Sequence, residues 1–138
     1  MPPLITTTKL VDFFASESQV KFAYLFGSHA HGAAGPLSDI DLAVYLDGQV
    51  DFFTTRLTLM VSLAKKIRTE NFDLVVLNQA PPVLQYEVIK TGVILKENKP
   101  RRVMFEAAVL RTYLDTIPMR KIQNQYLKDS LQKKAGHG

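Results

Sequence analysis

The chain has 138 residues, of which 46% are hydrophobic and 22% charged, and it carries a net charge of +4 and no cysteine. This length and composition fit one globular domain and exclude a disordered or fibrous protein, a disulfide framework and a thiolate zinc site. The N-terminus lacks the pattern of a signal peptide, and no apolar run approaches the roughly 20 residues that span a bilayer, so we expect a cytoplasmic protein.

The net charge is unevenly distributed along the chain. From Lys96 onward there are 10 basic and 4 acidic residues, whereas residues 1–95 carry 7 basic and 9 acidic residues. Nucleic acid is one interpretation of a basic C-terminal segment. A solvated helix that faces an acidic protein partner explains it at least as well, because the basic residues are spread out and are not clustered with aromatic ones.

Apolar periodicity and turn residues predict helices and strands in alternation. In chain order we expect a short helix capped by Thr6–Thr8, a strand at 20–26, a loop at 29–38, a strand at 39–44, a helix at 51–68 and a strand at 72–77. We then expect a helix from Pro81 to Lys90 capped by Gly92, a short strand at 93–95, a helix that stops near Pro118 and a helical segment at 119–133.

This order of elements predicts an α/β (α+β) fold, a small mixed β-sheet of about four strands flanked by helices. We expect one domain over residues 1–138, with a core at about 20–96 and a C-terminal helical segment at about 100–133.

Two of the predicted helices carry apolar residues at spacings of three and four, which is typical of a helix face that packs on a core. In the helix at 51–68 this stripe consists of Phe53, Leu57, Met60, Ala64 and Ile67. In the helix after residue 100 it consists of Val103, Ala107, Leu110 and Leu114. We expect both stripes to be buried.

Two aspartates, Asp39 and Asp41, begin the second predicted strand. Residues two apart on a strand point to the same face, about 6.6 Å apart along the chain, and unpaired carboxylates that close repel each other. A divalent cation removes the repulsion, and hard oxygen ligands suit Mg²⁺. Asp73, second in the third predicted strand, supplies a third carboxylate if the two strands pair. Three carboxylates on adjacent strands are what a two-metal phosphoryl-transfer site needs.

Gly27 and Ser28 follow the first predicted strand directly. A glycine at a strand end permits a close approach of the backbone, and the following N–H groups can form a cradle for an anion. The Ser28 hydroxyl adds one more donor for a phosphate oxygen. No Gly-Lys-Ser/Thr sequence follows, which excludes a P-loop.

Each of these features alone also has an ordinary structural interpretation. A Gly-Ser pair is usually a turn, a single Asp-x-Asp is often a solvated strand end, and Asp73 could be a charge at a strand edge. His29 and His31 could suggest a metal site, but loop histidines are more often exposed, and we assign them no role. The combined spacing is far more specific than any one feature.

Gly27-Ser28, ten intervening residues and Asp39-Ile40-Asp41 reproduce the GS-x10-DxD signature of the DNA polymerase β-like nucleotidyltransferases. The flanking stretches GSHAHG and SDIDLAV closely resemble the minimal nucleotidyltransferases (MNT), and the resemblance covers roughly residues 20–96. It implies that Gly27 and Ser28 hold a nucleoside triphosphate and that Asp39 and Asp41 bind two Mg²⁺ ions. Asp73 would be the third carboxylate, which helps to deprotonate the attacking hydroxyl.

One departure from the family pattern lies in the loop, where His31 stands at a position that is arginine in many relatives. The carboxylates that the family uses are all present.

The size of the chain indicates which members of this family it resembles most. About 40 residues lie beyond the core, too few for a separate substrate domain, and stand-alone members of this size resemble the MntA-type antitoxins of type VII-like HEPN/MNT pairs. That resemblance implies a protein adenylyltransferase that moves AMP from ATP to a tyrosine of a HEPN-domain ribonuclease toxin (HepT) and so neutralises it.

Two other functions remain open. The chain could be a non-catalytic antitoxin that neutralises its toxin by binding, although the retained carboxylates argue against a vestigial site. It could also modify a small molecule such as an aminoglycoside, for which a homodimer would have to build the pocket. For the toxin we expect docking on the C-terminal third of the chain, with Ile122, Tyr126 and Leu127 as apolar anchors.

Overall fold

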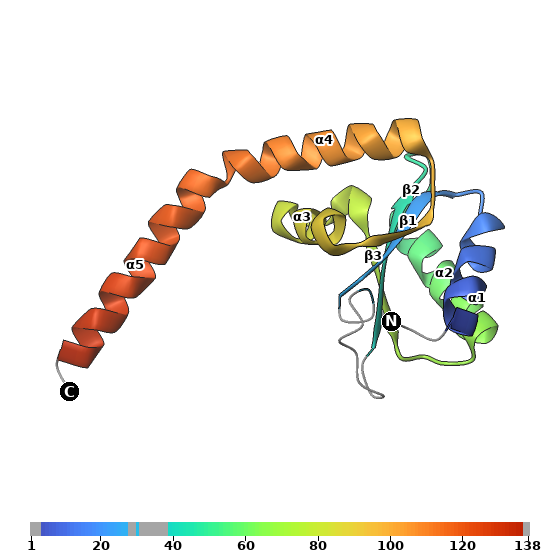
Figure 1. The fold of residues 1–138 in the computed structure, drawn as a ribbon, viewed down its shortest axis with the longest axis horizontal. Coiled ribbons are helices and arrows are strands. Elements are labelled where there is room, and N and C mark those ends of the chain that lie inside the picture. The colour runs from blue at the N-terminus through green and yellow to red at the C-terminus, as the bar shows by residue number, and fades with distance from the viewer. Residues whose placement is uncertain (1–3, 28–29, 31–38, 137–138) are drawn as a thin grey trace.

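The computed structural model describes residues 4–27, 30 and 39–136 of the chain (Figure 1). Its elements in chain order are α1 (Leu4–Ala15), β1 (Val20–Phe26), β2 (Ile40–Leu46), α2 (Phe52–Ile67), β3 (Phe72–Val76), the 3-10 helix η2 (Leu77–Gln79), α3 (Pro82–Thr91), β4 (Val93–Lys96), α4 (Lys99–Asp115) and α5 (Ile117–Gly136). The predicted elements are thus confirmed. Two helices begin earlier than predicted. α1 begins at Leu4, so that Thr6 to Thr8 lie inside the helix and do not cap it, and α5 begins at Ile117.

The four strands form one mixed sheet in the order β3-β2-β1-β4. β1 pairs antiparallel with both β2 and β4, whereas β2 and β3 are parallel. A parallel pair needs a crossover connection, and α2 provides it between β2 and β3. The expected mixed sheet flanked by helices is therefore confirmed.

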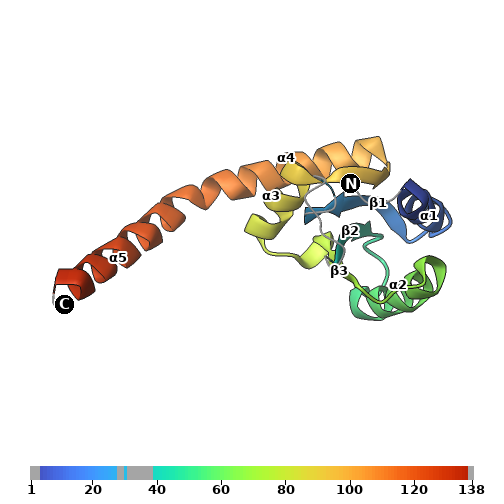
Figure 2. The same ribbon diagram turned by 60° about the horizontal axis from the view of Figure 1, so that its bottom comes forward.

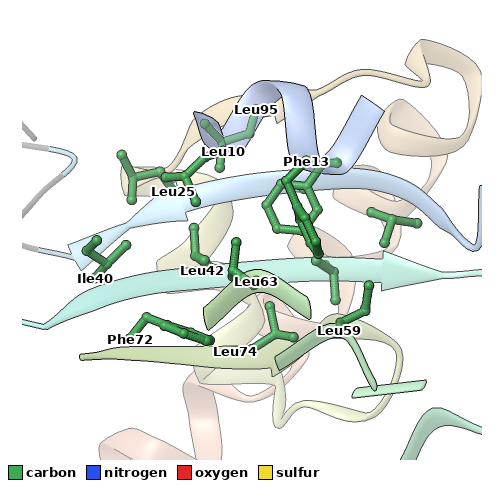
Figure 3. Packing of buried hydrophobic residues seen from close by; sticks show 14 of the residues in the cluster. Leu10, Phe13, Leu25, Ile40, Leu42, Leu59, Leu63, Phe72, Leu74 and Leu95 are labelled. Atoms are coloured by element: carbon green, nitrogen blue, oxygen red, sulfur yellow. The ribbon is translucent and has the colours of Figure 1, made fainter. Parts of the chain in front are cut away.

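Helices cover both faces of the sheet (Figure 2). On one face, α1 and α2 pack over the larger apolar cluster, where Leu10, Leu59 and Leu63 meet strand residues such as Leu42 and Leu74 (Figure 3). On the other face, α3 and α4 cover a smaller cluster. Its members are Phe22, Tyr24, Phe26, Ala43, Leu77 and Val88, with Phe105 of α4 packed against them. The two central strands, β1 and β2, are thus largely apolar on both faces.

The buried face of α2 is rotated from the one predicted. Leu59 and Leu63 are its buried residues, and Met60, Ala64 and Ile67 are partly buried against the core as expected. Phe53 and Leu57 are 68% and 45% exposed, so this part of the prediction is wrong. Asp51 caps the start of the helix, where its side chain accepts from Phe53 N.

The apolar stripe predicted for α4 is also wrong. Val103, Leu110 and Leu114 are 49%, 45% and 60% exposed, and Ala107 is exposed as well. The helix packs on the sheet through Phe105 and Val109 and through a polar contact described next. Counting aliphatic residues alone missed this face, because an aromatic ring and a carboxylate form most of it.

A hydrogen bond ties α4 to the centre of the sheet. The buried Tyr24 hydroxyl donates to Glu106 Oε1 over 2.6 Å, and Arg102 donates to both Glu97 and Glu106. Burial, followed by the hydrogen bond to Glu106, raises the pKa of Tyr24 well above its usual range. The tyrosine is therefore a neutral donor at physiological pH.

α5 extends away from the sheet as an arm that continues α4 with a bend (Figure 1). Three side chains define the bend: Tyr113 of α4 stacks on Tyr86 of α3, with ring centroids 3.7 Å apart, and Arg120 of α5 lies over the Tyr113 ring at 4.0 Å. Within the described residues, every helix falls short of the length and hydrophobicity needed to cross a bilayer.

Candidate active site

Three of the predicted site residues lie at one end of the sheet. Gly27 directly follows β1, Asp41 is the second residue of β2, and Asp73 is the second residue of β3. In the sheet register Asp41 is paired with Phe26 on one side and with Asp73 on the other. Asp41 therefore lies between the end of β1 and β3, the strand that carries Asp73.

Asp41 and Asp73 share one face of the sheet as well as one level. In-register residues of neighbouring strands point to the same side, and neighbouring strands are about 4.8 Å apart. Both aspartates therefore belong to the face that carries Ala43 and Val75 further along, opposite the larger cluster. The expectation that these strands pair and bring the two carboxylates together is confirmed for the backbone.

Gly27 allows the backbone to pass close to the Asp41 carboxylate. Its φ is +74°, and a Cβ atom built on it would collide with Asp41 Oδ2. The N–H of Ala30 donates to the Gly27 carbonyl over 3.2 Å, so the chain turns immediately after β1. Both the backbone conformation and the available space therefore require glycine here, which is a stronger reason than the sequence alone provided.

Asp73 is held by contacts at the outer edge of the sheet, which β3 forms. Its Oδ1 accepts from the N–H of Leu74 over 2.9 Å and lies 3.5 Å from Nη2 of Arg56. Arg56 Nε also donates to the Leu74 carbonyl over 2.8 Å. Sequence reasoning missed Arg56, because a single arginine within an amphipathic helix carries no signal that it will reach a strand 18 residues further on.

Of the two remaining predicted site residues, the structure describes Asp39 but not Ser28. Asp39 directly precedes β2 and is exposed. Ser28, His29 and His31 lie outside the described residues, as does the rest of the loop that the sequence predicts at 29–38 apart from Ala30.

The donor set at this end of the sheet fits Mg²⁺ in kind, because Asp39, Asp41 and Asp73 offer only hard carboxylate oxygens. As the side chains stand, the described part of the chain contains no group of three acidic or histidine residues that could hold one ion. Asp73 is engaged with Arg56 and Leu74. A metal that used all three carboxylates would therefore require side chains to move, with Asp73 contributing Oδ2, the oxygen that takes no part in these two contacts.

Comparison with known proteins agrees with this geometry. The family model for polymerase beta nucleotidyltransferases matches residues 8–101, which span all four strands, α2 and α3. The chain belongs to this family. No match was found among curated protein sequences.

Several solved structures with the same fold come from toxin–antitoxin complexes. A chain of a toxin–antitoxin crystallised with AMP-PNP is 25% identical, with a TM-score of 0.70 over 91% of this chain and 98% of that one. A chain of an MntA–HepT complex is 23% identical, with a TM-score of 0.64 over 93% and 97%. A chain from the complex of a tri-AMPylated Shewanella oneidensis HEPN toxin with its MNT antitoxin is also 23% identical, with a TM-score of 0.65 over 93% and 97%.

Proposed function

We propose that this chain is an antitoxin that acts as a Mg²⁺-dependent protein adenylyltransferase, moving AMP from ATP to a tyrosine hydroxyl of a HEPN-domain toxin. The observation that carries the proposal is the position of Asp41, in register with Asp73 on a parallel strand and directly against Gly27 on the other side. Nucleotide and acceptor can then approach Asp41 from opposite sides.

The nucleotide would bind on the Gly27 side. Gly27 leaves room for a phosphate to approach the backbone, and Ser28 would add a hydroxyl donor. The structural relative that was crystallised with AMP-PNP supports ATP as the substrate.

Mg²⁺ would be held by Asp39, Asp41 and Asp73, with two ions as the family resemblance implies. When bound, the metal would neutralise charge on the phosphates and on the transition state. The chain's own part is to present carboxylate oxygens from two adjacent strands at one level of the sheet.

Asp73 would serve the acceptor. The tyrosine oxygen attacks the α-phosphorus of ATP, a new P–O bond forms, the bond to the β-phosphate oxygen breaks, and pyrophosphate leaves. A tyrosine hydroxyl has a reference pKa of about 10, so it needs a base near neutral pH. Asp73 takes the proton, and its side chain is 62% exposed and thus accessible to a macromolecular substrate.

The partner is supported by the relatives and by the surface of this chain. The relatives described above are toxin–antitoxin complexes, and one contains a tri-AMPylated HEPN toxin. In this chain, α4 and α5 expose nine large apolar side chains: Val103, Met104, Leu110, Leu114, Met119, Ile122, Tyr126, Leu127 and Leu131. Many exposed apolar side chains on two consecutive helices are typical of a protein interface.

The first test is transfer of labelled AMP from ATP to the toxin encoded beside this chain, followed by mass spectrometry of the toxin. Asp39→Ala and Asp41→Ala should each reduce transfer at least about a hundredfold, because they remove the groups that support transition-state charge. The fold should persist, since removing one of two repelling carboxylates costs no packing. Asp12→Ala, on the exposed side of α1, is the matched control and should transfer normally.

The outcomes separate the proposal from its alternatives. Near-normal transfer by Asp41→Ala in excess Mg²⁺ would show that this carboxylate holds no metal. If the variant transfers nothing yet still neutralises the toxin, the chain acts as an antitoxin by binding. Transfer to an aminoglycoside but not to the toxin would point to small-molecule modification.

A further inference from the structure

β3 is the outer strand of the sheet next to the candidate active site, and its open edge carries the contacts of Asp73. In a parallel pair, alternate residues direct their backbone groups to the neighbouring strand. The N–H of Ile40 donates to the carbonyl of Asn71, so Asn71, Asp73 and Val75 bond toward β2. Leu74 therefore presents its N–H and its carbonyl away from the sheet.

Both outward groups of Leu74 are satisfied by side chains. Its N–H donates to Asp73 Oδ1 over 2.9 Å, and its carbonyl accepts from Arg56 Nε over 2.8 Å. The two side chains meet each other as well, with Arg56 Nη2 3.5 Å from Asp73 Oδ1. Arg56, Asp73 and the Leu74 backbone thus form a closed triangle, which we call the edge triangle.

The edge triangle restrains the carboxylate of Asp73 in a specific way. The hydrogen bond from the Leu74 N–H and the ion pair with Arg56 both involve Oδ1, so Oδ2 is not needed to hold the arrangement. Because the Leu74 N–H and the Arg56 guanidinium both restrain Oδ1, they also restrict the plane of the carboxylate and the position of Oδ2. A carboxylate that has to meet an incoming hydroxyl gains from such preorganisation.

We propose that Arg56 is a positioning residue for Asp73, which fixes the carboxylate through the edge triangle so that Oδ2 faces the acceptor hydroxyl. This rests on the proposed function. Arg56 acts on transfer only through Asp73 and takes no part in binding ATP, whose proposed site lies beyond β2 on the Gly27 side of the sheet.

A purely structural role for Arg56 would require its ion pair with Asp73 to contribute to the stability of the fold. Its side chain is 33% exposed and that of Asp73 is 62% exposed, and ion pairs this accessible contribute little to folding. Loss of Arg56 should therefore leave the thermal unfolding midpoint nearly unchanged, while transfer falls.

The geometry is tested without nucleotide or metal, by amide hydrogen exchange at Leu74 in the free protein. This N–H lies on an open edge, and Asp73 is its acceptor. Asp73→Ala should speed its exchange roughly threefold to tenfold, the range for loss of one net hydrogen bond. Arg56→Gln should have a smaller effect in the same direction, and Lys66→Gln, an exposed basic residue in the last turn of α2, should have none. Unchanged exchange in Asp73→Ala would overturn the edge triangle.

The function is tested by a double-mutant cycle on AMP transfer, measured with excess enzyme and labelled ATP. Arg56→Gln should lower kcat about tenfold with little change in KM for ATP, and Arg56→Lys should recover part of the loss because an ammonium can replace one donor of the guanidinium. In the Asp73→Asn background, Arg56→Gln should change kcat less than about twofold. Lys66→Gln should match the wild type.

Equal losses from Arg56→Gln in both backgrounds would overturn the proposal, because Arg56 would then act independently of Asp73. A rise in KM for ATP with unchanged kcat would do the same and would assign Arg56 to nucleotide binding. If the wild-type chain transfers no AMP, the proposed function fails, and exchange at Leu74 still decides whether the edge triangle holds Asp73.

Discussion

Gly27 is the residue at which backbone conformation and the candidate active site depend on each other most directly. Its φ of +74° disfavours any residue with a Cβ by about 1–2 kcal/mol, and that Cβ would also displace the Asp41 carboxylate. We therefore predict that Gly27→Ala lowers the free energy of unfolding by at least about 1 kcal/mol and reduces transfer more than tenfold. Denaturant unfolding and the transfer assay measure the two effects.

Gly48 provides the matched control for this substitution. A Cβ at Gly48 would meet nothing within 4 Å. Gly48→Ala should therefore stay within about 0.5 kcal/mol of the wild type and transfer normally. If Gly27→Ala were as active as Gly48→Ala, the close approach of Gly27 to Asp41 would have no importance for the site.

Asp73 and Arg56 show how far single residues can be interpreted from a sequence. The position of Asp73 in an apolar strand predicts a carboxylate at one end of the sheet, and its register with Asp41 bears this out. The contact between Arg56 and Asp73 could not be predicted, because it depends on the path of the crossover helix across the sheet edge. Asp73→Asn should reduce turnover much more than ATP affinity, and equally steep losses in both would make Asp73 a ligand only.

At the scale of elements, the attachment of α4 to the sheet depends on one buried hydroxyl. The hydroxyl of Tyr24 donates to Glu106, and burial first and this hydrogen bond second raise its pKa. In the unfolded chain a tyrosine ionises near pH 10, whereas Tyr24 in the folded protein keeps its proton above that pH. Its contribution to stability is thus complete below pH 10 and is lost as the pH rises further.

We predict that the free energy of unfolding falls by up to about 1.4 kcal/mol per pH unit above pH 10 on account of Tyr24. Denaturant titrations at pH 8 to 11 measure this slope, with Tyr24→Phe as the comparison. The variant should be less stable than the wild type at pH 8, because Glu106 loses the hydrogen bond from Tyr24, and the gap should narrow at pH 11. A gap that is independent of pH would contradict the raised pKa.

Periodicity predicted the helices themselves well, but it predicted poorly which face of each helix is buried. In both α2 and α4 the spacing of three and four was correct for a helix, but the buried side was displaced. For α4 the displacement leaves Leu110 and Leu114 exposed while Val109 is buried. Apolar residues surround much of each helix, so the sequence offers more than one face, and only the tertiary packing decides which one is buried.

At the scale of the whole molecule, α5 projects away from the sheet as an arm that continues α4 (Figures 1 and 2). Its exposed residues include the predicted anchors Ile122, Tyr126 and Leu127, at 66%, 72% and 58% exposure. We predict that truncation after Thr116 abolishes modification of the toxin and leaves ATP binding unchanged, because the arm docks the partner while the sheet holds the nucleotide. Calorimetric ATP binding and the transfer assay distinguish the two.

Two full-length variants test the same docking surface without a truncation. Tyr126→Ala with Leu127→Ala should weaken toxin binding at least about tenfold, since anchors of this kind dominate interface energies. Gln123→Ala with Asn124→Ala, on the same exposed helix, is the control. Association should slow as salt rises, because basic residues there steer the encounter. Loss of ATP binding on truncation would instead make α5 part of the fold.

The sequence by itself determined the order and type of the elements and which short stretches carry the candidate carboxylates. These features depend on local period, turn residues and the spacing from Gly27 to Asp41, all of which are properties of short stretches of chain. Only the tertiary structure decided which faces of α2 and α4 are buried, that Gly27 lies against Asp41, and that Arg56 restrains Asp73. Each of these depends on contacts between segments far apart in the chain, where several packings satisfy the same pattern.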